Sequence, residues 1–171
     1  GALDRLASLQ IGQCSIGALP ESFGDLGSLT HLNLDLAALK KLPANFGKLV
    51  ALAHLDLTLS SLQELPESMC HLTALQELNW RQYSSFCRGV KQGDGSSSKI
   101  TQLPESIGNL TALKKVSLSY LRLKVLPESI GRWTTLETLI LHSLIDLSAL
   151  PGSIGDLSRL TSLKIACCGI E

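Results

Sequence analysis

One short phrase, written six times, constrains what this chain can fold into. The copy from Leu103 to Leu118 reads LPESIGNLTALKKVSL, and close variants begin at five other Leu-Pro pairs. The leucines of the six pairs lie at positions 19, 42, 65, 103, 126 and 150, so the steps are 23, 23, 38, 23 and 24 residues. A period in this range is typical of a solenoid, in which each repeat packs only on its neighbours.

Each repeat orders its apolar residues as LxxLxxLxL, followed by a gap and then LxxLP. One set comprises Leu26, Leu29, Leu32, Leu34, Leu39 and Leu42. The LxL part alternates apolar and polar residues, which predicts a strand with one face in solvent. The LPESIG part predicts a short helical turn, with proline at its first position, glutamate at its positive start and glycine at its end. Stacked repeats would bury a continuous leucine ladder.

The phrasing LPxSIGxLTxLxxLxL resembles plant-type leucine-rich repeat (LRR) proteins over essentially the whole chain. Plant intracellular Ras-group-related LRR proteins and the LRR domains of plant nucleotide-binding immune receptors use it, and some bacterial effectors imitate it. The resemblance implies an α/β repeat fold, a right-handed LRR solenoid. A parallel β-sheet would line its concave face, which such proteins use for protein recognition, and short helical turns would form its convex face.

The predicted domain is a single unit, residues 1–171, of about seven repeats of 23–24 residues, interrupted by a Gly- and Ser-rich loop insertion at 84–98. In one respect it departs from the common LRR pattern, which places asparagine three residues after the LxL. The residues in this slot are Cys14, Ala37, Ser60, Tyr83, Leu121, Leu144 and Cys168. No asparagine ladder can form, so the backbone amides of these turns need other partners.

Composition narrows the partners and the compartment. Lysine plus arginine balances aspartate plus glutamate at 15 each, which argues against a nucleic-acid partner, and no apolar run is long enough for membrane insertion. Five cysteines, an odd number, favour free thiols in a reducing compartment, so we expect an intracellular, cytoplasmic protein. The chain starts and stops inside repeats, so we expect a fragment of a longer chain, with its ends covered by missing sequence or by a neighbouring subunit.

The partner-binding residues are expected on the concave face. Parallel strands place equivalent residues of neighbouring repeats about 4.8 Å apart, so the face can be written as rows. Arg81 and Tyr120 stand out as interface anchors, and Leu36 and Leu59 as apolar contacts along the rim. The alternative is a solvated polar sheet face without a partner. The predicted binding residues are His31, Asn33, Asp35, Leu36, His54, Asp56, Leu59, Glu77, Asn79, Arg81, Tyr120 and His142.

No cofactor, metal or catalytic centre is expected. His31, His54 and Glu77 form a set that could bind a transition metal, but a flat strand face does not converge three side chains on one point. Trp80 and Trp133 occupy leucine slots and are expected in the core. The sequence contains no Ser/His/Asp set, phosphate-binding glycine loop or CxxC pair, so we expect that the chain is not an enzyme.

The leading hypothesis is a non-enzymatic interaction module, or scaffold, that recognises a protein partner through its concave face, with a possible contribution from the loop at 84–98. A second hypothesis is the recognition domain of a larger enzyme or receptor, such as a ubiquitin-ligase effector or a nucleotide-binding immune receptor. A third is a structural subunit of a large assembly.

Overall fold

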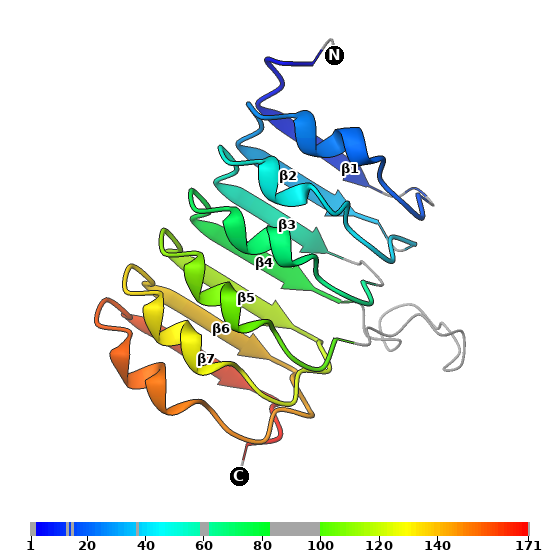
Figure 1. Ribbon diagram of the computed structural model, residues 1–171. Coiled ribbons are helices and arrows are strands. Elements are labelled where there is room, and N and C mark those ends of the chain that lie inside the picture. The colour runs from blue at the N-terminus through cyan, green and yellow to red at the C-terminus, as the bar shows by residue number, and fades with distance from the viewer. Residues whose placement is uncertain are drawn as a thin grey trace.

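Seven strands form one parallel sheet in the computed structural model of the chain, and they lie in chain order like the rungs of a ladder (Figure 1). The structure describes residues 3–12, 14, 16–36, 38–58, 62–82 and 100–170. The strands are β1 (Ser8–Gly12), β2 (His31–Asp35), β3 (His54–Thr58), β4 (Glu77–Arg81), β5 (Lys115–Ser119), β6 (Thr138–His142) and β7 (Ser162–Ala166). The predicted solenoid of stacked repeats is confirmed.

The register of the sheet is the one that the repeat predicts. His31 lies between Ser8 and His54, and His54 in turn pairs with Glu77. The pairing continues across the long step of 38 residues, where Glu77 pairs with Lys115. Equivalent positions of the repeats therefore form continuous rows across the sheet.

Short 3-10 helices pack behind the sheet, on the side away from its solvent-facing rows (Figure 1). They are η1 (Glu21–Asp25), η2 (Phe46–Lys48), η3 (Glu67–His71), η5 (Glu105–Asn109), η6 (Glu128–Arg132) and η7 (Gly152–Asp156). The prediction placed the proline at the first helical position, but in η1, η3, η5, η6 and η7 it is the residue before the helix, with φ between −69° and −67°. Its fixed φ still suits the entry into the turn.

The glycine of the LPESIG phrase lies inside the turn rather than at its end. A Cβ built on Gly108 would lie 2.5 Å from the carbonyl oxygen of Ser129 in the next repeat. The requirement is therefore close packing between adjacent convex turns rather than helix termination. One repeat departs from this rule, because Cys70 occupies the glycine slot of η3.

Glutamates of the LPES phrase tie adjacent convex turns together. A carboxylate oxygen of Glu21 accepts a hydrogen bond from the backbone N–H of Ala44 at 3.2 Å, and one of Glu105 accepts from Ser129 at 3.3 Å. Glu128 accepts from the N–H groups of Gly152 and Ser153, at 3.1 and 2.9 Å. Each bond satisfies donors at the start of the next turn, which have no partner within their own helix.

The leucine ladder forms the core. Leu34, Leu57 and Leu141 are fully buried, and burial of each such side chain stabilises the fold by about 1.5–3 kcal/mol. Trp80 and Trp133 are both 1% exposed, which confirms their prediction as core residues. The indole Nε1–H of Trp133 donates to the carbonyl oxygen of Ile107 at 3.0 Å, so its one polar group is satisfied.

Apolar side chains and backbone pairing replace the missing asparagine ladder in the later repeats. Leu121 and Leu144, in the asparagine slot, are at most 1% exposed. Just before them, the N–H of Tyr120 donates to the carbonyl of His142, and that of Ser143 donates to Ala166. Among the described residues, no helix has the length and apolar character needed to cross a bilayer.

Candidate partner-binding face

The solvent-facing side of the sheet, which we call the concave face, contains a hollow of about 440 Å³. Side chains from β1 to β4 form most of it, and its far rim reaches β5 and β6. Beneath it lie Leu32, Leu55 and Leu78, whose side chains are buried in the core, and most of the side chains around it are polar. The lining residues are Ser8, Leu9, Gln10, His31, Leu32, Asn33, His54, Leu55, Asp56, Glu77, Leu78, Asn79, Lys115, Ser117 and Ile140.

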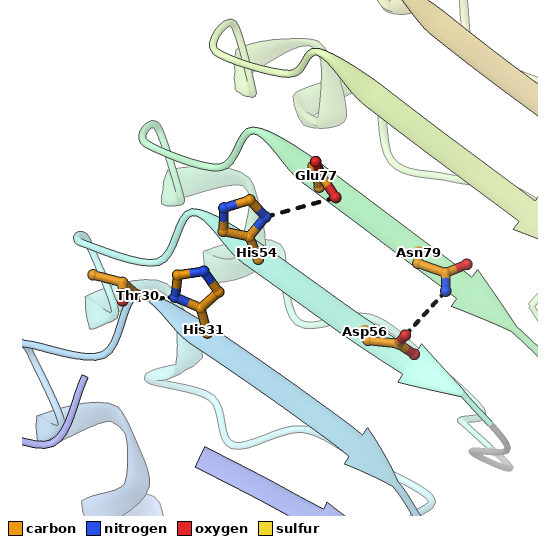
Figure 2. A network of polar contacts seen from close by, with 6 residues as sticks. All are labelled: Thr30, His31, His54, Asp56, Glu77 and Asn79. Carbon is orange, nitrogen blue, oxygen red and sulfur yellow. Dashed lines mark hydrogen bonds and ion pairs between the residues drawn. The ribbon is translucent and has the colours of Figure 1, made fainter. Parts of the chain in front are cut away.

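Two stacked histidines stand at one end of the hollow. The rings of His31 and His54 have centroids 4.3 Å apart and planes 15° apart. Nδ1 of His54 lies 3.6 Å from a carboxylate oxygen of Glu77, and Nδ1 of His31 lies 2.9 Å from the hydroxyl of Thr30 (Figure 2). The rings are thus held upright on neighbouring strands, side by side and facing each other.

Carboxylate and amide groups form the middle of the hollow. The side-chain N–H of Asn79 donates to Asp56 at 3.0 Å, as Figure 2 shows, and the hydroxyl of Thr58 donates to the other oxygen of Asp56. Oδ1 of Asn33 and Oδ1 of Asp35 are buried and have no hydrogen-bond partner among the described residues. A buried acceptor without a donor is uncommon in folded proteins, so this part of the face lacks donors rather than acceptors.

A second cluster lies at the other end of the strands. The guanidinium carbon of Arg81 is 5.5 Å from the ring centroid of Tyr120, which is a cation–π distance. The ring of Tyr120 is in turn 5.2 Å from that of His142, at 57°. Tyr120 has a φ of 59°, in the left-handed region that non-glycine residues rarely adopt. The sheet therefore brings together three of the predicted binding residues as one stack.

Leu36 corrects the predicted site. It was expected as an exposed apolar contact on the rim, in the same row as Tyr120, but its side chain is fully buried. The reason is backbone geometry: Tyr120 and Ser143 have positive φ values, whereas Leu36 does not, and its carbonyl accepts from Leu39 in a turn that leads inward. Leu59, the other rim leucine, and the loop at 84–98 lie outside the described residues.

The other predicted residues all lie on the solvent-facing rows of β2, β3, β4 and β6 or directly after β5. Prediction omitted five lining residues on the solvent-facing rows of the hollow, namely Ser8, Gln10, Lys115, Ser117 and Ile140. The signal for them was present, because they occupy the same rows as Asn33 and His54. In the part of the chain that the structure describes, no three His, Cys, Asp or Glu side chains converge as metal ligands would.

Neither a scan of protein-family models nor a search of the curated proteins by sequence finds a match. Solved structures do match. A TLR13–ssRNA13 complex has a TM-score of 0.77 at 24% identity, over 99% of this chain and 23% of that one. The LRR domain of the type III effector XopL gives 0.59 at 24%, over 88% and 57%.

A third match is the plant peptide hormone receptor RGFR1 in complex with RGF2, with a TM-score of 0.56 at 24% identity, over 96% of this chain and 33% of that one. This chain therefore spans less than two thirds of the length of each of these three neighbours. At 24% sequence identity, the similarity to these structures shows a shared fold and nothing more.

The TLR13 complex corrects one expectation. Balanced charge was taken to exclude a nucleic-acid partner, and that exclusion is wrong, because a solenoid of this fold is seen with single-stranded RNA. Net charge summed over a whole chain says little about a local surface, where charges of one sign can gather. With the sheet, the convex turns and these neighbours together, the chain has the fold of a leucine-rich repeat solenoid.

Proposed function

We propose that this chain is a non-enzymatic interaction module that recognises a protein partner through its concave face. The polar hollow across β1 to β4 is the observation that carries this proposal. A solvated sheet face needs neither a hollow nor acceptor groups that lack donors, whereas a binding surface uses both. The RGFR1 neighbour, which has this fold, is itself seen in complex with RGF2.

The rigidity of the sheet supplies the mechanism. The contact side chains stand on strands that are hydrogen-bonded to their neighbours, or, for Tyr120, directly after one, so the spacing of the rows is set before any partner arrives. Binding then costs little conformational entropy on this side, and many modest contacts can add to a useful affinity. The Arg81–Tyr120 pair, at the other end of the strands from the stacked histidines, would act as an anchor.

We also propose an intracellular setting for this recognition. Cys14, Cys70, Cys167 and Cys168 are free thiols in the described part of the chain, which fits a reducing compartment. A thiol-reactive probe would label these cysteines when it is applied to the protein isolated from its native source and then denatured under non-reducing conditions, which exposes the buried Cys70 as well. Blocked thiols would contradict this setting.

The test compares two double variants with the same change in charge. Asp56→Ala with Arg81→Ala removes one acid and one base from the concave face. Lys41→Ala with Glu64→Ala removes an exposed ion pair, with N–O distance 2.7 Å, away from this face. In affinity capture from native extract, followed by titration of the captured protein, the first variant should bind about tenfold more weakly or worse, and the second like wild type.

Thermal unfolding must be measured alongside binding. Asp56 and Arg81 are not in the leucine core, so the unfolding temperature of their double variant should remain close to that of the Lys41 and Glu64 variant. Equal binding by both variants would contradict the proposal. The concave face would then be a solvated polar surface that does not bind the partner.

A further inference from the structure

We infer that the hollow at β1 to β3 takes an arginine side chain of the partner. This inference rests on the proposed function and names the chemistry that its site would recognise. Two independent features lead to it: the distribution of charge along the face, and the acceptors that lack a charged or hydrogen-bonding partner.

Charge on the concave face is segregated by strand. The rows of β1, β2 and β3 carry Asp35 and Asp56 and no lysine or arginine, whereas those of β5, β6 and β7 carry Lys115 and Lys164 and no carboxylate. Between them, β4 carries one charge of each sign. Positive charge on the partner is therefore favoured opposite the first three strands, and negative charge there would cost several kcal/mol.

The cations of this chain do not neutralise those carboxylates. Arg81 lies over the ring of Tyr120, one strand beyond Asp56. Among the described residues, neither Asp35 nor Asp56 has an ion-pair partner, and both oxygens of Asp56 accept only from the neutral groups of Thr58 and Asn79. The negative charge is thus held in place by neutral donors and remains available to a cation.

The unpartnered acceptors specify a group with several donors. Within the hollow, Oδ1 of Asn33 has no donor among the described residues, and Asn33 lies opposite Asp56 on β3. Asp35, two residues further along β2, has an Oδ1 that also lacks a donor, but it is not among the residues that line the hollow. A guanidinium carries five N–H donors in a plane, so it can reach two or three such oxygens at once. An ammonium group carries three donors and no plane, and a phosphate carries only acceptors and negative charge.

The test uses a defined probe rather than the unknown partner. An acetylated and amidated pentapeptide, Gly-Ser-Arg-Ser-Gly, is titrated into the ¹⁵N-labelled protein and followed by two-dimensional NMR. The matched ligand has citrulline in place of arginine, which keeps the shape and removes the charge. We expect the arginine peptide to bind about tenfold more tightly, with shifts centred on the amides of β1 to β3, because charge-assisted hydrogen bonds are the stronger ones.

Two variants locate the contact. Asp56→Asn keeps the shape of the side chain and should weaken the arginine peptide about fivefold to tenfold while leaving the citrulline peptide unchanged. Asn33→Ala should weaken it through loss of the acceptor opposite Asp56. Glu64→Gln, a carboxylate removed from elsewhere on the surface, should change nothing. Well-dispersed spectra of each variant show that the fold is intact.

The failure of this inference can be separated from failure of the proposed function. Equal binding of the two peptides, or no binding of either, overturns the inference that the hollow binds arginine. So does a short single-stranded oligoribonucleotide that shifts the same β1 to β3 amides more strongly than the peptide. If the Asp56 and Arg81 double variant still loses its captured protein in those cases, the concave face remains the binding surface and only the identity of its contact is wrong.

Discussion

Replacement of Gly108 by alanine tests how tightly the convex turns pack. The added Cβ would lie 2.5 Å from the carbonyl oxygen of Ser129 and 2.8 Å from its Cβ, about 0.9 Å short of an ordinary contact at 3.4 Å. The nearest obstacle is backbone in the next repeat, so it cannot rotate away as the tip of a side chain could. The clash can be relieved only if the repeat of Gly108 and the repeat of Ser129 move apart or slide past each other.

The expected cost follows from two opposing effects. Overpacking of this kind costs about 1–3 kcal/mol. Alanine also restricts the unfolded chain, which returns about 0.4–1 kcal/mol. The net loss is about 1–2 kcal/mol, which for a chain of this length lowers the unfolding temperature by roughly 2–8 °C.

Gly155 provides the matched control. It occupies the same slot of its own repeat, in η7, and a Cβ built on it meets nothing within 4 Å. Gly155→Ala should therefore be neutral or should raise the unfolding temperature by roughly 1–3 °C. Urea and thermal unfolding, followed by circular dichroism, measure both variants. Equal effects of the two substitutions would refute the close-packing argument.

Two further predictions concern charge and backbone strain. Hydrogen bonds from the backbone N–H groups of Ser153 and Gly152 hold the pKa of Glu128 below its usual value, so its carboxylate contributes stability above the unfolded pKa, and this contribution is lost as pH falls through the folded pKa. The urea midpoint of Glu128→Gln should lie below wild type near neutral pH and converge with it in acid; a constant gap would contradict this. Cys167 is exposed with a φ of 56°, so Cys167→Gly should be neutral or more stable by up to about 1 kcal/mol, and Cys167→Val should be less stable, in the same assay. The opposite order would show that this φ carries no strain.

The periodicity of the sequence predicted the features of the fold that depend on many residues at once, namely the core positions and the strand register. A leucine in the wrong row would leave the core, so the positions of Leu32 and Leu34 on β2 and the pairing of His31 with His54 follow from the spacing of the repeat alone. The same argument placed Trp80 and Trp133 in the core. Each of these outcomes is enforced by several neighbours at once.

Features decided by a single torsion or a single neighbour were not predictable. Whether the residue after a strand faces solvent, like Tyr120, or the core, like Leu36, depends on one φ angle. The role of Gly108 depends on a backbone atom about twenty residues away in the chain. The stack of His31 on His54 depends on rotamers, and rows identify neighbours without giving the directions in which their side chains point.

Cys70 has a consequence for the shape of the face that binds. Its side chain is 2% exposed, its pKa is raised by burial, and the hydroxyl of Ser106 lies 3.1 Å from its sulfur. Where other repeats have a bare glycine between adjacent turns, this one has a thiol between η3 and η5. The strands opposite them remain hydrogen-bonded in register.

In an arch whose inside is held at constant spacing, the size of a side chain between the outer turns sets the bend at that point. Residue 70 lies behind β4 and β5, where Glu77 pairs with Lys115 and where Arg81 meets Tyr120. A change in the size of this one buried residue would therefore change the angle between the acidic and basic halves of the concave face.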